Sequence, residues 1–259
     1  MHATSRFASL CRPFAALAAG VLIAAPAFAE QGSWWHWTAG NATLGSGKLA
    51  TETRTLGSFQ AIELKGSMKL VVQQGPKESV ELRGDDNLLP LIETTVVDHG
   101  GIPTLEIDAK RGTSFSARNP LVITVSVATL RSLSLSGSGD AVADGLKAGD
   151  LQLRVSGSGD VRVRRLDADA LMVKVSGSGD VGVSGHAAKL SVSIAGSGDV
   201  TTHELQADDV SVSIAGSGDA SVNARKTLAV SIAGSGDVAY VGDAAVEASI
   251  AGSGSVKKR

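Results

Sequence analysis

The chain has 259 residues, a formal net charge of −2, one cysteine and 31 glycines, and only 3% of its residues are aromatic. This near-neutral balance argues against nucleic acid as a partner, because contacts with phosphates require a basic surface. A single cysteine excludes an intramolecular disulfide framework, so stability has to come from burial and hydrogen bonds. The scarcity of aromatic side chains leaves Val, Leu, Ile and Ala to build the core.

Residues 1–29 have the pattern of a signal peptide. Arg6 and Arg12 precede an apolar run from Phe14 to Ala27, and Ala27-Phe28-Ala29 fits the small-x-small cleavage pattern. The run is short and is interrupted by Pro26, which disfavours a membrane-spanning helix. We therefore expect an exported protein, in the periplasm or at the cell surface, whose mature chain has no transmembrane segment.

Residues 30–54 are rich in Gly, Ser, Thr and Ala and are predicted to form a linker or an N-terminal cap. Three tryptophans lie close together in this segment, at Trp34, Trp35 and Trp37. They have two interpretations. They cover the open end of the first coil of a repeat protein, or they contact sugars or a membrane interface.

Residues 55–130 show strand patterns without a regular repeat. The stretch "FQAIELKGSMKLVVQQG" alternates on both sides of a degenerate corner at Lys65-Gly66-Ser67, and "SVELRGDD", "TLEIDAK" and "LVITVSV" follow as further strands. We expect irregular early coils of the same solenoid that continues to the end of the chain.

Residues 131–259 repeat one unit. The sequence Gly-Ser-Gly returns seven times at intervals of 18 to 20 residues, and the residues between the copies alternate in polarity. Both glycines of each copy fall on the apolar, inward register. The pattern predicts an all-β fold, a single-stranded parallel β-helix with coils of about 18–20 residues, and an inward glycine marks a corner that excludes a side chain or has positive φ. The corner glycines are Gly137, Gly139, Gly157, Gly159, Gly177, Gly179, Gly196, Gly198, Gly216, Gly218, Gly234, Gly236, Gly252 and Gly254.

These features resemble a known family. The segment "GSFQAIELKGSMKLVVQQGPKESVELRGDDNLLPLIETTV", followed by serial "SGSGDV" corners, is similar to exported bacterial proteins of the putative auto-transporter adhesin, head GIN domain family. The resemblance covers about residues 55–255. It implies a right-handed β-helical fold and no established activity.

An aspartate follows most corners and forms a column on the outward register, at Asp140, Asp160, Asp180, Asp199, Asp219 and Asp237. Carboxylates one strand spacing apart repel each other by about 0.9 kcal/mol in a water-like dielectric, which a bound divalent cation would relieve. The alternative is that each carboxylate accepts backbone N–H groups in its own corner, as aspartates do in turns. We expect the structural role, with no metal and no cofactor, and keep a cation-binding column as the alternative.

The remaining motifs do not indicate a cofactor site or a catalytic site. "GSGDVG", with Gly177, Gly179 and Gly182, matches a dinucleotide motif, but a strand follows it instead of the required helix, and Gly182 has no counterpart in the other coils. The histidines are expected in surface loops, at His36, His99, His186 and His203. The connections between strands are too short to wall a catalytic cleft, so we expect no enzyme.

Two outward surfaces are candidates for binding. One is small and weakly polar, at Ser191, Ser193, Ala195, Ser211, Ser213, Ala215, Ala229, Ser231, Ala233, Ser249 and Ala251. The other is basic, at Arg154, Arg162, Arg164, Arg165 and Lys174. Both are ordinary solvated faces unless they bind a glycan, an envelope component or another copy of the chain.

The sequence therefore predicts an exported, adhesin-like binding module of the cell envelope without catalytic activity. Three alternatives stay open: a self-associating structural protein, a cation-dependent adhesin that uses the aspartate column, and an enzyme acting on polysaccharides.

Overall fold

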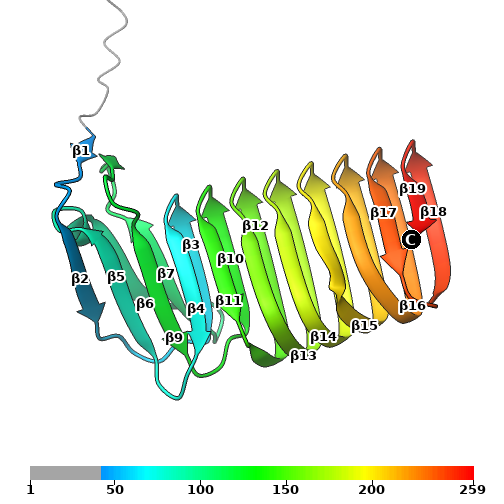
Figure 1. Cartoon of the computed structure of the whole chain (residues 1–259), viewed down its shortest axis with the longest axis horizontal. Coiled ribbons are helices and arrows are strands. Elements are labelled where there is room, and N and C mark those ends of the chain that lie inside the picture. Colours follow the sequence, from blue (N-terminus) through cyan, green and yellow to red (C-terminus); the bar gives the residue numbers. More distant parts are fainter. Residues whose placement is uncertain (1–41) are drawn as a thin grey trace, which may run out of the picture. The chain divides into compact units, whose positions relative to one another are not determined.

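The computed structural model describes residues 42–259. These residues form a β-solenoid whose coils stack side by side along one direction (Figure 1). The predicted signal peptide, Trp34, Trp35, Trp37 and His36 lie outside the described residues, as does the first part of the predicted linker. Within residues 42–259 there is no helix long and apolar enough to cross a membrane.

The described part contains β-strands and one short 3-10 helix, η1 (Leu89–Leu91). The N-terminal strands are β1 (Thr43–Leu44), β2 (Leu49–Arg54), β3 (Ala61–Gly66), β4 (Lys69–Gln74), β5 (Ser79–Asp85), β6 (Ile92–Asp98), β7 (Pro103–Ala109), β8 (Phe115–Ser116) and β9 (Val122–Val127). The later strands are β10 (Ser132–Gly137), β11 (Asp140–Asp144), β12 (Lys147–Gly157), β13 (Val161–Gly177), β14 (Val181–Gly196), β15 (Val200–Gly216), β16 (Ala220–Gly234), β17 (Asp237–Val241), β18 (Ala245–Gly252) and β19 (Ser255–Lys258).

The later coils are parallel and in register, which confirms the predicted solenoid. The first part of β13 pairs with β11 and its second part pairs with β12, so each coil contributes a strand segment to each of two layers. We call the layer that holds the segments just after each Gly-Ser-Gly corner the post-corner layer, and the other the pre-corner layer. Between them, β13 bends where its register shifts between Val163 and Leu166, and Arg165 there has φ of +51°.

The core is aliphatic, as the composition predicts. Inward side chains of successive coils lie directly on one another, as in the buried column Leu153, Val173, Val192, Val212 and Val230. Burial of each such side chain contributes about 1.5–3 kcal/mol. The columns therefore bind each coil to its neighbours, and a coil has few contacts elsewhere.

The corner requires glycine at two positions for two different reasons. The first glycine of each copy has positive φ, from +119° at Gly137 to +140° at Gly216. The second glycine is buried in the regular coils, and a Cβ on Gly198 would overlap the carbonyl oxygen of Gly179 in the preceding coil. A Cβ on the first glycine would meet the preceding coil in the same way. Only the second glycine is fully inward, because the first lies at the turn itself and is half-buried in most copies.

One coil of the N-terminal region has the same parallel pairing and the same glycine corner. Strand β3 pairs in parallel with β10, with Gly66 opposite Gly137, and β4 pairs in parallel with β11. Gly66 has φ of +96°, so the Lys65-Gly66-Ser67 stretch turns the chain as the later corners do.

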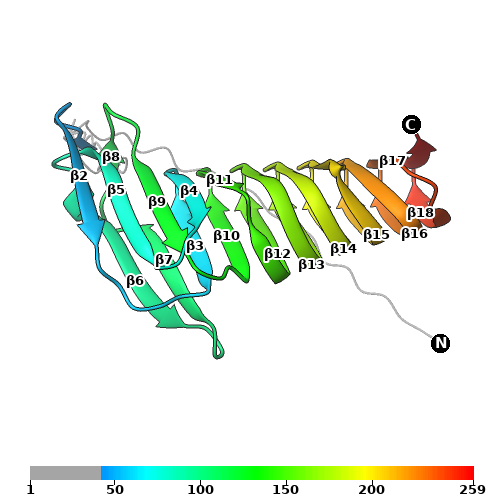
Figure 2. The same cartoon turned by 60° about the horizontal axis from the view of Figure 1, so that its bottom comes forward.

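Strands β7 and β9 continue the solenoid by a further coil, because they pair in parallel with β3 and β4. Strands β5 and β6 depart from the expected early coils. Strand β5 is antiparallel to β2 and β9, and β6 is antiparallel to β7. The physical reason for the β6–β7 pair is its connection of four residues, His99 to Ile102, because parallel partners need a crossover of a dozen residues or more. Residues 49–54, predicted as a linker or cap, form β2 beside β5 at the N-terminal end of the described part (Figure 2).

Candidate functional site

The aspartate column forms a ladder of hydrogen bonds between coils. The backbone N–H of Asp199 donates to Oδ1 of Asp180 at 3.0 Å, and the N–H of Asp219 donates to Oδ1 of Asp199 at 2.9 Å. The same bond joins Asp180 to Asp160 at 3.3 Å and Asp237 to Asp219 at 2.8 Å. Each carboxylate from Asp160 to Asp237 thus accepts from the next coil and not from its own corner, which corrects the expected turn geometry. Asp140, at the first corner, takes no part in the ladder.

The ladder ends at Ser255. Its N–H and its hydroxyl both donate to Oδ1 of Asp237, each at 2.8 Å. These two donors, the hydroxyl first, hold the pKa of the Asp237 carboxyl below its ordinary value. One oxygen of each carboxylate from Asp160 to Asp237 is therefore engaged in the stack, and the second oxygen takes no part in the ladder.

The small outward side chains lie in the pre-corner layer. Ser193, Ser213, Ser231 and Ser249 follow one another in register, and the alanines after them form a parallel row. Most of these side chains are exposed. The surface predicted from the sequence is therefore one continuous area of short side chains.

The predicted basic residues do not form one patch. Arg162 lies in the post-corner layer, whereas Arg154 and Lys174 face each other in the pre-corner layer. Arg165 binds the carboxylate of Asp144 through two hydrogen bonds, of 2.8 and 2.7 Å. The histidines are also apart, since His186 lies opposite Gln206 and not beside His203.

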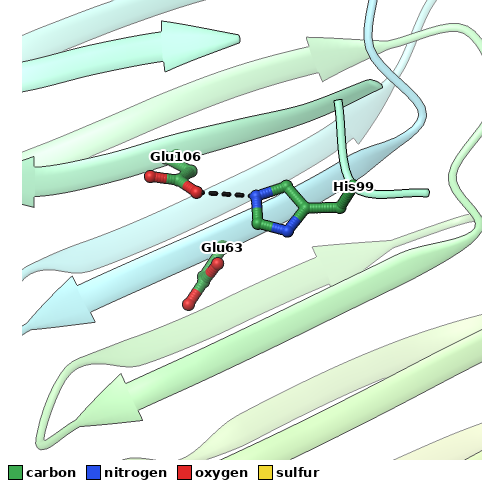
Figure 3. A group of neighbouring side chains, drawn as sticks. All are labelled: Glu63, His99 and Glu106. Atoms are coloured by element: carbon green, nitrogen blue, oxygen red, sulfur yellow. Dashed lines mark hydrogen bonds and ion pairs between the residues drawn. The ribbon is translucent and has the colours of Figure 1, made fainter. Parts of the chain in front are cut away.

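A cluster that the sequence analysis did not find lies beneath the β6–β7 turn. His99 on the turn approaches Glu106 on β7 and Glu63 on β3 (Figure 3). Nε2 of His99 lies 2.8 Å from Oε1 of Glu106, and one nitrogen or oxygen of each of the three side chains lies within 4.8 Å of the others. Nζ of Lys65 lies 3.6 Å from Glu63 and 3.5 Å from Glu106.

The cluster contains one ammonium and two carboxylates besides the His99 ring. The hydrogen bond with the His99 ring has the largest effect on the Glu106 carboxyl and lowers its pKa; burial opposes this, and Lys65 lowers the pKa further. For Lys65, desolvation opposes the charged form, but Glu63 and Glu106 outweigh it and the pKa of the amine is raised. Two carboxylates and an imidazole are a ligand set that Zn²⁺ accepts, but the ammonium of Lys65 already forms ion pairs with both carboxylates. The geometry supports a structural role, in which the cluster holds the turn against β3.

The cluster borders a shallow groove of about 420 Å³ on the pre-corner layer, whose floor includes Ser134 and Arg154. The sequence could have indicated that the two glutamates are exposed to a common surface, because alternation places each on the outward register near the middle of its strand. Their proximity could not be predicted, because it depends on the pairing of β3 with β7 across 43 positions, which places Glu63 opposite Glu106.

A second hollow, of about 400 Å³, lies on the post-corner layer over β13, β14 and β15. Gly182 is part of its lining, and Arg162 and Thr201 flank that glycine in register. Gly182, the third glycine of the sequence that matches a dinucleotide motif, therefore lies on the outward side of β14, as the second residue of that strand.

Stacked parallel coils with a glycine corner and outward rows of polar side chains define a β-solenoid. The chain belongs to the family described as putative auto-transporter adhesin, head GIN domain, which matches residues 58–244. No curated protein sequence matched the chain.

Solved structures of similar proteins share the fold. A putative adhesin from Bacteroides fragilis is 26% identical, with a TM-score of 0.77 over 84% of this chain and 100% of its own. A putative lipid binding protein from Parabacteroides distasonis is 25% identical, with a TM-score of 0.70 over 84% of this chain and 99% of its own. A putative adhesin from the same species is also 25% identical, with a TM-score of 0.67 over 85% and 100%.

Proposed function

We propose that this protein is exported by its signal peptide to the cell surface and binds an extended envelope or host ligand there, without catalysis. The observation that carries the proposal is the in-register stacking of the coils. It converts single outward side chains into rows that repeat at about 4.8 Å over two layers. A surface of this kind suits a long polymer, which meets the same groups again at each coil.

Family membership supports binding as the function. Two of the similar solved structures are described as putative adhesins, and a third as a putative lipid binding protein. A glycan or another envelope component is therefore the partner class we propose. Both surface hollows described above are lined by charged and hydroxyl side chains, which favours a glycan.

The aspartate column supports a structural role better than a cation-binding role. Oδ1 of Asp160, Asp180, Asp199 and Asp219 accepts a backbone N–H of the next coil. A cation bound along the column would compete with these donors for the carboxylates. We therefore propose an adhesin that does not depend on a divalent cation.

Retention assays on purified mature protein, residues 30–259, test the proposal. The protein is passed over immobilised peptidoglycan, capsular polysaccharide and lipid vesicles, and its oligomeric state is measured by sedimentation. We expect retention of a monomer by a polysaccharide, unchanged by chelator. Ordered oligomers that bind none of these materials would contradict the proposal and favour the self-associating structural protein. Release of reducing sugar from the polysaccharide would contradict the non-catalytic part.

A further inference from the structure

Gly182 has no structural reason to be glycine. Its φ is not positive, and a Cβ built on it would meet no atom within 4 Å. It is paired with Arg162 in β13 and Thr201 in β15, and the register of β14 against β15 shifts directly after it, between Gly182 and Gly185. Glycine weakens a strand interior and is retained there where a bulge, a bend or the close approach of another group requires it. No group of the described residues approaches the position of a Cβ on Gly182, so the missing side chain leaves open space that a ligand can enter.

The side chains around Gly182 include charged hydrogen-bond donors and hydroxyl groups. Arg162 and Arg164 supply guanidinium donors, while Ser184 and Thr201 supply hydroxyls. The hollow is completed by Val163, Val181, Val183 and His203 and by three carboxylates, those of Asp180, Asp199 and Glu204. Its volume, about 400 Å³, is within the range of small-molecule sites.

Several of these groups keep unused hydrogen-bonding capacity. Arg162 uses one terminal nitrogen on Asp160, at 3.2 Å. Arg165, and not Arg164, binds Asp144, so the Arg164 guanidinium has no ion pair among residues 42–259. Asp180 and Asp199 use Oδ1 in the ladder, and their Oδ2 atoms take no part in it.

We propose that the hollow over Gly182 binds one acidic pyranose, a uronic acid unit of a polysaccharide. This inference rests on the proposed binding function and specifies its ligand. The sugar carboxylate pairs with Arg164 and Arg162, since guanidinium matches a carboxylate in geometry and charge. The ring hydroxyls bond to the free aspartate oxygens and to Thr201. The missing side chain of Gly182 lets the ring lie against the backbone of β14.

A second hollow lies next to the first on the post-corner layer. An adjoining hollow of about 520 Å³ shares Asp199, Thr201 and His203 with the first, and it also includes Lys257 and Lys258. From Gly182 to Lys257 the outward row crosses four strand spacings, about 19 Å. A polymer of acidic sugars thus meets arginines at one end of the row and lysines at the other, with the carboxylates of Asp219 and Asp237 between them.

Calorimetric titration of the mature protein with trigalacturonate, and with its methyl ester as the neutral probe, tests the inference. We expect the acid to bind at least tenfold more tightly than the ester at low salt, and this preference to shrink as salt rises. Gly182→Val fills the hollow and should weaken binding of the acid at least tenfold, with an unfolding midpoint equal to or above that of the wild type. Arg164→Gln should weaken it about tenfold, as expected when one charge-assisted pair is lost. Thr51→Val, a change at an exposed position of β2 away from both hollows, should leave binding unchanged.

The outcomes separate the inference from the function on which it rests. If the acid and the ester bind equally, or if Gly182→Val and Arg164→Gln both bind like the wild type, the site is wrong and the binding function stands. If trigalacturonate does not bind but a different envelope polysaccharide retains the protein, the ligand class is wrong. If no polysaccharide is retained at all, the proposed function fails together with the site.

Discussion

Replacing a corner glycine with alanine should destabilise the solenoid far more than replacing a glycine on its surface. In Gly216→Ala the new residue keeps φ near +140°, and its Cβ overlaps the carbonyl oxygen of Gly196 in the preceding coil. Strain at such a φ costs about 1–3 kcal/mol. Relief of the overlap requires a backbone shift, and overpacking of this kind costs about 1–3 kcal/mol. Together they lower the free energy of unfolding by about 2–6 kcal/mol.

Gly182→Ala is the matched control. Its φ is ordinary and its Cβ meets nothing within 4 Å, so alanine should raise the free energy of unfolding by about 0.5–1 kcal/mol. Denaturant titrations followed by circular dichroism measure both variants against the wild type. The reasoning is refuted if Gly216→Ala unfolds at the same denaturant concentration as Gly182→Ala, because the corner would then tolerate a side chain.

Three further predictions concern charged groups. Asp199→Ala removes the acceptor of the Asp219 N–H and should lower the free energy of unfolding by about 0.5–1.5 kcal/mol, whereas a loss of calcium-dependent stabilisation in this variant would support the cation column instead. The pKa of Glu106 is lowered from its ordinary value of 4.5 in the folded state, so its contribution to stability is present above pH 4.5 and is lost as pH falls through the folded pKa. In Glu106→Gln the unfolding midpoint should therefore fall less on acidification than it does in the wild type. An equal fall in both proteins would contradict the stabilisation of the Glu106 carboxylate by His99. Chelator should leave the melting temperature of the wild type unchanged, because Lys65 already forms ion pairs with both carboxylates near His99, and a lower melting temperature would show a bound metal.

The regular coils could be predicted because every copy repeats the same local information. Alternation fixes which side chains face inward, and a constant interval fixes the stacking, so the register of Gly137 with Gly157 follows from the sequence. The aspartate ladder was only half predictable. The column follows from the period, but the direction of its bonds depends on how far the corners of adjacent coils are offset.

The N-terminal strands and the His99 cluster could not be predicted in the same way. Strands β5 and β6 have the alternation of solenoid strands, and alternation does not distinguish parallel from antiparallel pairing. The meeting of Glu63 with Glu106 depends on which distant strands pair, and no local pattern encodes that choice. Gly182 was visible as an unmatched glycine, but its significance depends on the empty space that the structure shows above it.

Labelling of intact cells tests the proposed surface binding most directly. Cys11, the only cysteine, lies in the predicted signal peptide, so Ser217→Cys at an exposed corner places a single thiol in the mature chain. A maleimide that does not cross membranes should label this thiol on intact cells as fully as on permeabilised cells. Labelling only after permeabilisation would show that the protein is enclosed in the periplasm, and it would contradict a surface adhesin.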